Sequence, residues 1–577
     1  MKKEIQRNPF LQMVVDRIHA GISPVQYTET EVREHWILMP DGVGLYGLSV
    51  QPKSEEKDRW PVVLMRNPYV WYEELETLIG TFFAEQGYAF IINRVRGTGK
   101  SKGEFEPFVH EREDGRAVID WIAEQPWCDG NIATFGGSYL GHVQWCVSDY
   151  DHPALKTHFI QVYGGARPYH AFYRNGMFRQ DIWTEWSCQM MGDHKESADE
   201  AYIQEQVRKG FEIVPQSELG EQLIGQECTW YKEWIVATSE LDPYWSEGFW
   251  KEIDQAVEKI TRPVFLQGGL YDAFARNMLE SWKRLPQETR ARSRFVYGPW
   301  NHRSAPAGDL EYPGEAIFAP LLQIDGAINW FDHIVKGKEY AHPVGVMEVY
   351  SVGENCWRTW QDQPVPVDTV TYRLSADKAL VPIDNQDAEE KICFDYNPAD
   401  PVPSISYGLW KGSILSPKPA YREDVVSFLT EPLEEPMYLG GSIELSLEVA
   451  SSAPATAFAV TVFETTEEEE SYWITEDITD IRWEGEAVPS VYQPGNRKVL
   501  KIRMQDVFWM LKKGSRLRLD VSSSNYPLYH VHPNTEKNWA EKNEPVIAHQ
   551  TIFCGGEAQS YIRLPLMEKQ TDTRLMV

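Results

Sequence analysis

The sequence predicts a three-part chain: an α/β core with a doubly wound sheet, an inserted helical cap and a C-terminal β-sandwich of the jelly-roll type. Strand-like and helix-like segments alternate from about residue 31 to 145, which is typical of a parallel sheet covered by helices. The alternation stops after residue 150, and beyond residue 340 short apolar runs separated by turn residues replace it. We therefore assign residues 1–150 and 251–340 to the core, 151–250 to the cap and 341–577 to the sandwich.

The predicted core elements follow one another in a regular order. A hairpin comes first, then a buried strand, a helix leading into another strand, and a further helix: Val32–Leu38 with Gly44–Val50, Pro61–Arg66, Phe82–Gln86 leading into Tyr88–Asn93, and 111–125. The turn Cys128-Asp129-Gly130 then begins the strand that precedes Ser138. After the cap we expect two short apolar strands, Pro263–Gly268 and Arg294–Gly298, and a helix over Ala316–Val335.

The cap and the sandwich differ from the core in their residue patterns. Residues 151–250 contain no clear strand, but they carry six tryptophans, at 183, 186, 230, 234, 245 and 250, within long amphipathic stretches. An inserted, mostly helical segment fits this pattern best. The sandwich strands are expected at Gly345–Val352, Ser442–Val449, Ala457–Phe463, Val499–Met504 and Arg516–Val521.

The composition argues against several classes of partner and of metal site. The 577 residues include 56 Lys and Arg against 86 Asp and Glu, a net charge of −30, which argues against nucleic acid or an anionic membrane as partner. The seven cysteines are widely spaced without a Cys-x-x-Cys pair, so neither a disulfide framework nor a zinc site is indicated. No apolar run approaches ~20 residues and none follows the basic N-terminus, so a cytoplasmic protein without a membrane span is expected.

A candidate nucleophile lies at residues 135–145, Phe-Gly-Gly-Ser-Tyr-Leu-Gly-His-Val-Gln-Trp. An apolar strand meets two glycines, then Ser138, then a segment with helical spacing, which is the pattern of a strand that turns sharply into a helix. The strict elbow motif is Gly-x-Ser-x-Gly, whereas here Gly136 lies two residues before Ser138 and Gly141 three after it. An ordinary glycine turn is the alternative interpretation.

Two later loops offer the partners that a serine nucleophile needs. Asp272 follows the strand-like run at 264–267, and His302 follows the one at 295–297. In isolation, Asp272 would be read as a helix N-cap and His302 as a surface loop residue. Their order along the chain, Ser, Asp, His, and their position after strands favour a catalytic triad instead.

The linked motifs resemble the cocaine esterase and X-prolyl dipeptidyl peptidase family of serine hydrolases. The family's elbow is Gly-x-Ser-Tyr-x-Gly, which accounts for the displaced glycine. The matching segments cover nearly the whole chain: 135–145, Gly-Gly-Leu-Tyr-Asp at 268–272, Gly-Pro-Trp-Asn-His at 298–302, Arg66-Asn67-Pro68-Tyr69, Arg96-Gly97 through Gly103-Glu104-Phe105, Trp121-Ile122 with 125–131, and 523–527 with 533–535.

The resemblance implies an α/β-hydrolase core, a helical cap and a C-terminal jelly roll, the three parts read above. It also implies an oxyanion hole formed by the backbone N–H of Tyr139 and the hydroxyl of Tyr69, and it implies no cofactor. Trp71, just after Tyr69, is expected in the pocket wall, and two tryptophans of the cap, Trp183 and Trp186, are further candidates for substrate contact.

Other signals are set aside. Gly97 to Ser101 resembles the end of a phosphate-binding loop, but the first glycine of that motif is replaced by Arg94. His530 and His532 could face one side of a strand, yet no third metal ligand is identifiable, so no metal is expected. His142, four residues after Ser138, lies on the elbow helix and is expected to be a packed residue and not a catalytic one.

The sequence therefore predicts a serine carboxylesterase that cleaves a small-molecule ester or amide through an acyl-enzyme. An X-prolyl dipeptidyl aminopeptidase and an amino-acid-ester or antibiotic acylase remain the alternatives within the family. A non-catalytic ligand-binding protein is the alternative from a different class, disfavoured because it would gain nothing from the Ser, Asp and His set. A homodimer is compatible with the sequence, and the natural substrate is left open.

Overall fold

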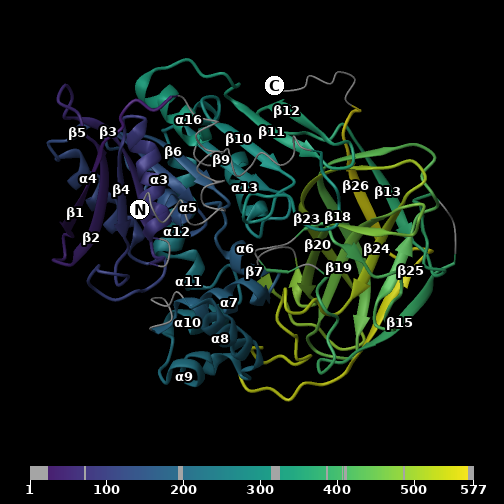
Figure 1. Cartoon of the computed structure of the whole chain (residues 1–577). Coiled ribbons are helices and arrows are strands. Elements are labelled where there is room, and N and C mark those ends of the chain that lie inside the picture. The colour runs from purple at the N-terminus through teal and green to yellow at the C-terminus, as the bar shows by residue number, and fades with distance from the viewer. Residues whose placement is uncertain are drawn as a thin grey trace.

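The chain forms an α/β core, a cap and a β-sandwich, arranged as Figure 1 shows with the core on the left and the sandwich on the right. The computed structural model describes residues 24–70, 73–192, 199–313, 325–384, 388–405, 407–408, 412–484 and 488–569. One hydrophobic cluster runs through all three parts, because it contains Trp183 of the cap, Met278 of the core and Leu447 of the sandwich. The parts therefore share a buried core, which fixes the cap and the sandwich against the α/β sheet.

The core is built on a ten-stranded sheet of order β1-β2-β4-β3-β5-β6-β9-β10-β11-β12. Its strands are β1 (Thr30–Leu38), β2 (Gly44–Pro52), β3 (Trp60–Asn67), β4 (Ala89–Arg94), β5 (Cys128–Gly137), β6 (Leu155–Gln161), β9 (Val264–Gly269), β10 (Arg294–Gly298), β11 (Val346–Ser351) and β12 (Cys356–Gln361). From β4 to β11 the neighbours run parallel, while β1, β2 and β12 are antiparallel at the edges. The predicted hairpin and the predicted doubly wound sheet are confirmed.

Helices cover both faces of this sheet. They are α3 (Glu73–Glu85) and α16 (Asp325–Lys336) on one face, and α4 (Glu111–Ala123), α5 (Tyr139–Cys146), α12 (Gly248–Lys259) and α13 (Ala275–Arg284) on the other, with the short α14 (Gln287–Arg290) before β10. In β9, Phe265 packs in the cluster that contains α16, whereas Val264 and Leu266 pack in the cluster that contains α12 and α13. This alternation explains why the strand is apolar throughout. The part of the predicted helix Ala316–Val335 that precedes residue 325 lies outside the described residues.

Both predicted core boundaries need correction. Strand β6 falls in the segment assigned to the cap, and β11 and β12 fall beyond residue 340, yet all three are hydrogen-bonded into the core sheet. β6 is not apolar in sequence because Thr157 and His158 interrupt it. Both are buried through hydrogen bonds, from Thr157 Oγ1 to Pro263 O at 2.7 Å and between His158 Nδ1 and Thr134 Oγ1 at 2.8 Å. A strand buried by side-chain hydrogen bonds carries no hydrophobic signature.

The cap is helical, as predicted. It consists of α6 (Tyr169–Phe172), α7 (Gln180–Met190), α8 (Glu200–Glu212), α9 (Leu219–Ile224), α10 (Thr229–Val236) and α11 (Pro243–Ser246), with the small hairpin β7 (Tyr173–Arg174) and β8 (Met177–Phe178) and a 3₁₀ turn at Gln216–Glu218. Its tryptophans are buried and pack on one another; Trp183, for example, stacks on Phe172 with ring centroids 3.8 Å apart. Aromatic packing of this kind holds together helices that are too short to be stable alone.

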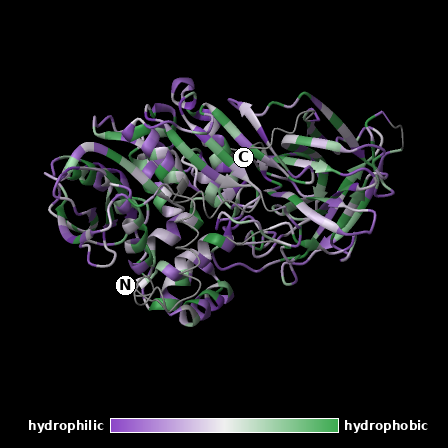
Figure 2. Cartoon of the chain, turned by 45° about the horizontal axis from the view of Figure 1, so that its top comes forward, coloured by the Kyte–Doolittle hydropathy of each residue, from purple (hydrophilic) through white to green (hydrophobic). Residues whose placement is uncertain are grey.

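The C-terminal part is a two-sheet sandwich, as predicted. One sheet has the order β14-β13-β26-β18-β25-β15 with β23 paired to β18, and the other has the order β16-β20-β19-β24-β17. The strands are β13 (Asp368–Leu374), β14 (Leu380–Pro382), β15 (Glu390–Tyr396), β16 (Leu415–Ser416), β17 (Val426–Leu429), β18 (Met437–Ser451), β19 (Ala457–Thr465), β20 (Ser471–Asp480), β23 (Lys498–Leu511), β24 (Arg516–Ser522), β25 (Ala548–Cys554) and β26 (Tyr561–Leu566), with a short extra pair β21 (Trp483–Glu484) and β22 (Val488–Pro489). Hydrophobic residues of both sheets meet in the shared core, and Figure 2 shows hydrophobic and hydrophilic positions mixed along the strands.

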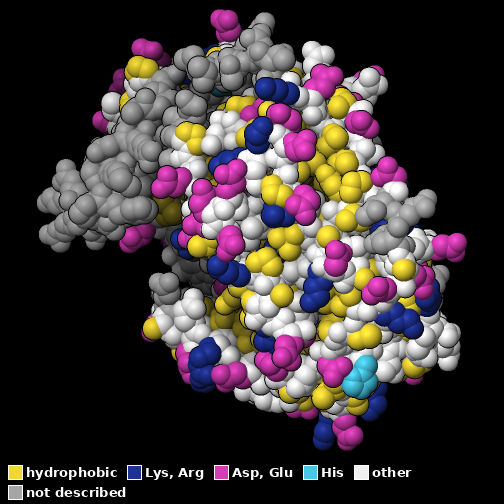
Figure 3. Space-filling model, turned by 90° about the vertical axis from the view of Figure 1, so that its right-hand side faces the viewer, with side chains coloured by type: hydrophobic (Ala, Val, Ile, Leu, Met, Phe, Trp, Pro, Cys, Tyr) yellow, Lys and Arg dark blue, Asp and Glu magenta, His cyan; other side chains and the backbone are white. Residues whose placement is uncertain are grey.

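Acidic side chains are scattered over the surface drawn in Figure 3, as they are scattered along the sequence. On the face drawn in Figure 3, Asp and Glu side chains are spread among Lys and Arg rather than gathered into one patch. Among the residues that the structure describes, no helix is both long enough and apolar enough to cross a membrane.

Candidate active site

Ser138 lies at the turn between β5 and α5, in a backbone conformation that serine rarely adopts. Its φ is 59° and its ψ is −126°, outside the regions that are comfortable for a residue with a side chain. Surrounding hydrogen bonds hold the turn: Ser138 N–H donates to Gln161 O at 3.1 Å, and Ser138 O accepts from the Gly141 and His142 N–H groups at 2.8 and 3.0 Å. The turn therefore presents the hydroxyl at the carboxyl end of the parallel strands.

The glycines around Ser138 are required by close packing. A Cβ on Gly136, whose φ is +139°, would lie 2.5 Å from Leu140 Cβ. A Cβ on Gly141 would lie 3.0 Å from Tyr163 Cβ and 3.1 Å from Gln161 O. The position two residues after Ser138 holds Leu140, whose side chain covers Gly136, so the close approach of helix α5 to the sheet occurs one residue later than in the strict elbow motif.

The three predicted triad residues form one hydrogen-bonded chain. His302 Nε2 lies 2.9 Å from Ser138 Oγ, and His302 Nδ1 lies 2.7 Å from Asp272 Oδ2. Asp272 is 4 % exposed, and its other oxygen, Oδ1, accepts the Phe274 N–H at 2.7 Å. The carboxylate thus closes a local turn before α13 and also orients the imidazole, so the two interpretations of Asp272 are compatible.

The loops that carry Asp272 and His302 are joined to each other by backbone hydrogen bonds. Because β9 and β10 are parallel neighbours, their ends lie side by side. Leu270 N–H donates to Gly298 O at 2.9 Å, and Tyr271 N–H donates to Trp300 O at 3.0 Å. Gly269 permits this approach, since a Cβ there would lie 2.2 Å from Trp300 O. The pairing of the loops sets the distance between carboxylate and imidazole.

Tyr139 is the first residue of helix α5, so its backbone N–H is one of the donors that a helix leaves without an intrahelical acceptor. Its hydroxyl points away into the core, where it donates to Glu111 Oε1 at 2.8 Å and accepts the Phe108 N–H at 2.9 Å. Burial, followed by the charge of Glu111, holds the pKa of the Tyr139 hydroxyl well above its usual value. The Tyr139 side chain is therefore engaged within the core, and the contribution of its backbone N–H to the site stays a prediction.

Tyr69 follows the end of β3 and is fixed by two polar groups of the core. Its N–H donates to Asn67 Oδ1 at 2.9 Å, and its carbonyl accepts a hydrogen bond from Arg94. Arg94 in turn forms a buried ion pair with Glu76 of α3, with Arg94 Nη2 2.6 Å from Glu76 Oε2. Sequence reasoning missed this pair because its two residues are 18 positions apart, beyond the range over which a local residue pattern indicates a contact.

One residue of the cap, Trp186, contacts Tyr69. Its indole Nε1–H donates to the Tyr69 Oη at 3.1 Å, and its ring is nearly parallel to that of Tyr139, with centroids 6.0 Å apart and 8° between the planes. Phe274, which sequence reasoning missed although it follows Asp272 by two residues, lies with its ring centroid 5.6 Å from that of His302. Both rings flank the residues around Ser138.

The other two predicted pocket tryptophans have different outcomes. Trp183 is 3 % exposed and its indole N–H donates to Ala171 O at 2.8 Å, which places it in the aromatic core of the cap rather than on a pocket surface. Trp71 lies outside the described residues.

Three histidines outside the triad, His142, His530 and His532, are engaged in packing and hydrogen bonds. His142 is buried with its Nε2 3.3 Å from Cys146 Sγ, and burial lowers its pKa to about 3, so the ring is neutral. His530 Nδ1 accepts the Phe178 N–H at 3.0 Å, and His532 Nε2 lies 3.1 Å from Asp480 Oδ2. Within the described ranges, no group of three or more His, Cys, Asp or Glu side chains is arranged to hold a metal ion.

Known proteins are similar to this chain along nearly its whole length. Residues 41–304 match the model of the X-Pro dipeptidyl-peptidase family S15, and residues 339–563 match the C-terminal non-catalytic domain of X-Pro dipeptidyl-peptidase. The cocaine esterase of Rhodococcus sp. (strain MB1 Bresler) is 26 % identical over 575 residues, covering 92 % of this chain and 97 % of the relative.

Solved structures share the whole fold. An aminopeptidase from a marine sediment Thaumarchaeota archaeon superposes with a TM-score of 0.79 at 20 % identity, and an α-amino acid ester hydrolase with 0.75 at 22 %, each covering 95 % of this chain and 98 % of the other. A CocE/NonD family hydrolase from Staphylococcus aureus gives 0.67 at 15 %, covering 95 % and 100 %. The chain belongs to the cocaine esterase and X-prolyl dipeptidyl peptidase-like family of serine hydrolases.

Proposed function

We propose that this protein is a serine carboxylesterase in which Ser138 is the nucleophile, His302 the general base and Asp272 the residue that orients the imidazole. The observation that carries the proposal is the continuous hydrogen-bonded chain from Ser138 Oγ through His302 to Asp272 Oδ2. A serine hydroxyl attacks a carbonyl only when a base removes its proton, and a buried carboxylate keeps that base in the required tautomer.

In the proposed reaction, Ser138 Oγ attacks the ester carbonyl while its proton passes to His302 Nε2. Asp272 accepts a hydrogen bond from the Nδ1–H of His302 and stabilises the imidazolium that forms. The tetrahedral intermediate collapses when His302 returns the proton to the departing alcohol, which leaves an acyl group on Ser138. Water, activated by the same histidine, then attacks the acyl-enzyme and releases the acid.

The oxyanion of the intermediate would be held by the Tyr139 N–H and the Tyr69 hydroxyl. Trp186 supports the second of these donors, because an indole N–H can only donate and therefore occupies a lone pair of the Tyr69 oxygen. The proton of Tyr69 must then point away from Trp186. Donors fixed in advance around the developing charge are worth roughly 3–4 kcal/mol each.

The described side chains beside the triad are uncharged, which favours an ester substrate over a peptide with a free N-terminus. Trp186, Phe274 and Tyr69 are uncharged, and they suit an apolar acyl group. An aminopeptidase would require a carboxylate placed to bind the substrate ammonium, since a charged group is bound out of water only with a partner. Aminopeptidase and acylase activity stay alternatives, as the names of the similar structures include both types of enzyme. A homodimer also stays a prediction.

The test compares hydrolysis of short p-nitrophenyl esters with hydrolysis of Ala-Pro-p-nitroanilide, in the wild type and in Ser138→Ala. We expect turnover of the esters, loss of it in the variant, and labelling of Ser138 by a fluorophosphonate. Ser148→Ala is the matched control, because the Ser148 hydroxyl only donates to Trp145 O at 2.9 Å. A preference for the anilide would replace the esterase proposal by the peptidase one, and unchanged rates in Ser138→Ala would refute the nucleophile.

A further inference from the structure

Outside the candidate active site, a cavity of about 40 Å³ lies where the cap, helix α13 and strand β23 meet. We call it the basic cavity, because its wall includes Arg167 and His170 from the cap, Arg276 and Lys283 from α13, and Arg503 from β23. A site of this size has room for a small ion, whereas organic ligands occupy pockets of roughly 300 Å³ or more. The cavity is therefore distinct in kind from a substrate pocket.

The wall carries more positive than negative charge, although the whole chain has a net charge of −30. Arg167, Arg276, Lys283 and Arg503 line it against only Glu280 and Asp506. Three of the four cations have carboxylate partners: Arg167 with Glu240 at 3.2 Å, Arg276 with Asp477 at 3.3 Å and Lys283 with Asp506 at 2.6 Å. Arg503 is exposed and forms no ion pair with any residue that the structure describes.

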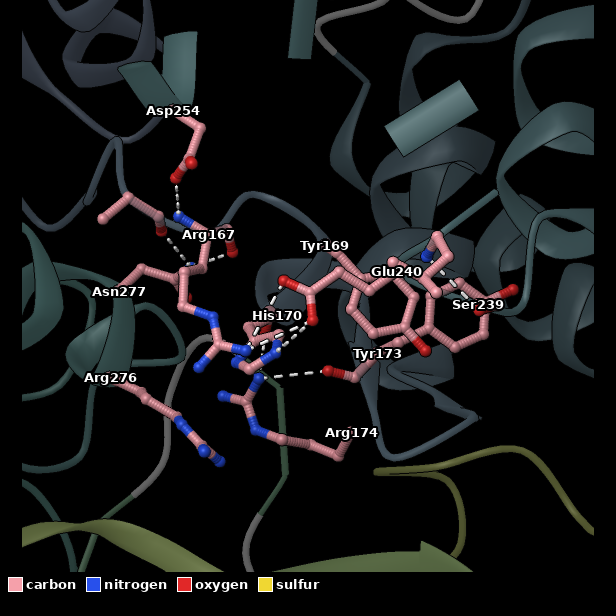
Figure 4. Close-up of polar contacts among 12 residues, drawn as sticks. Arg167, Tyr169, His170, Tyr173, Arg174, Ser239, Glu240, Asp254, Arg276 and Asn277 are labelled. Atoms are coloured by element: carbon pink, nitrogen blue, oxygen red, sulfur yellow. Dashed lines mark hydrogen bonds and ion pairs between the residues drawn. The ribbon is translucent and has the colours of Figure 1, made fainter. Parts of the chain in front are cut away.

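A further cation lies buried beside this wall. Arg174 is 7 % exposed, and its Nη1 donates to the carbonyls of His170 and Tyr173, but no carboxylate of the described chain pairs with it. Burial, followed by the charge of Arg276, lowers the pKa of Arg174 to about 10. Figure 4 shows the guanidinium groups of Arg167, Arg174 and Arg276 gathered around His170, with Glu240 on the opposite side.

Buried cations are stable only when anions or strong acceptors compensate them. We propose that the basic cavity binds a small inorganic oxyanion of the phosphate or sulfate type, which joins the cap, the core and the sandwich. Guanidinium groups suit such an anion because their planar N–H pairs match two oxygens at once. Entry is from the side of Lys283, which is 30 % exposed, and the exposed Arg503.

An anion bound there would stabilise the folded chain, because the three parts that supply its ligands are together only in the native state. The test uses the full-length protein in a zwitterionic buffer, with sodium phosphate or sodium sulfate titrated against sodium chloride at constant ionic strength. We expect the unfolding temperature to rise saturably by several degrees with either oxyanion, and isothermal titration with inorganic phosphate to give one site per chain.

The variant Arg503→Gln keeps the fold, since its side chain is exposed, and should raise the apparent dissociation constant for phosphate at least fivefold. Arg503→Lys should lose less than Arg503→Gln. Arg208→Gln, which removes the same charge from the surface of α8, should leave phosphate binding unchanged. All three should hydrolyse p-nitrophenyl esters at the wild-type rate.

Three results would overturn the proposal. One is an unfolding temperature that is the same in phosphate, sulfate and chloride. Another is an equal loss of phosphate binding in Arg503→Gln and Arg208→Gln. The third is an equal or larger stabilisation by sodium acetate, which would assign the cavity to carboxylates instead.

Discussion

The indole N–H of Trp186, in the cap, donates a hydrogen bond to the hydroxyl oxygen of Tyr69, in the core, at 3.1 Å. This bond joins two residues 117 positions apart and links the cap to the tyrosine proposed to hold the oxyanion. Because the bond fixes which lone pair of the Tyr69 oxygen is occupied, the cap contributes to the direction in which the Tyr69 proton points. Trp186 is in this sense a positioning residue.

If Trp186 acts through Tyr69, removing both should cost no more than removing Tyr69 alone. We expect Tyr69→Phe to lower kcat by about 10²–10³-fold, as for other single oxyanion donors. Trp186→Phe should lower kcat several-fold with little change in KM, and the double variant should match Tyr69→Phe. Steady-state kinetics of ester hydrolysis measure all three, and strictly additive losses would show that the two residues act independently.

The roles of the backbone and the side chain of Tyr139 can be separated. Tyr139→Phe removes the hydroxyl that binds Glu111 and the Phe108 N–H but keeps the backbone N–H at the helix start. We expect a loss of about 1–3 kcal/mol in the free energy of unfolding, because buried polar partners are left unsatisfied. The kcat of the folded variant should stay within about threefold of wild type, in contrast to that of an oxyanion-donor loss. Urea unfolding and kcat report the two effects, and a kcat loss as large as that of Tyr69→Phe would contradict the assignment.

Asp272→Asn should leave the fold intact and reduce kcat by on the order of 10³–10⁴-fold, because an amide can donate to Nδ1 and so favours the wrong tautomer of His302. The bond from the Phe274 N–H to the side-chain oxygen can survive the change. Circular dichroism and thermal unfolding should show a wild-type fold. Activity within tenfold of wild type would mean that Asp272 serves only to close the turn before α13.

Glu185 in α7 should make the chain less stable as the pH rises. Burial, followed by the charge of Asp181, raises its pKa from 4.5 to about 7. A raised carboxyl pKa means that the folded chain keeps a proton that the unfolded chain has lost, so the free energy of unfolding falls between pH 4.5 and 7, by up to about 3 kcal/mol.

The variant Glu185→Gln should therefore stabilise the chain at pH 8 but not at pH 4.5. Glu205→Gln is the control on the exposed surface of α8. A hydrogen bond from Arg208 lowers the pKa of the Glu205 carboxyl to about 2. The effect of Glu205→Gln on the unfolding temperature should therefore be nearly the same at both pH values. Unfolding temperatures at pH 4.5 and 8 measure the difference. If Glu185→Gln changed the unfolding temperature equally at both pH values, ionisation of Glu185 would not be the cause of the loss of stability with rising pH.

The parts of the fold that the sequence predicted are those with local signatures. The alternation of strands and helices, the tryptophan-rich cap and the turn-separated strands of the sandwich are confirmed. Strand β6 was missed because Thr157 and His158 are buried by hydrogen bonds rather than by apolar character. β11 and β12 were assigned to the sandwich because a short strand does not reveal which sheet it joins.

The sequence by itself determined the order Ser138, Asp272, His302 and the place of each after a strand, since glycines, turn residues and apolar runs act within a few positions of the chain. Only the tertiary structure decided the distances of 2.9 and 2.7 Å among their side chains, which follow from the parallel pairing of β9 with β10 and from the bonded loops. It also decided that Trp186 contacts Tyr69 while Trp183 is core, and that cations from three parts of the chain surround one cavity. Contacts of this kind depend on how elements distant in sequence pack, and no local pattern encodes them.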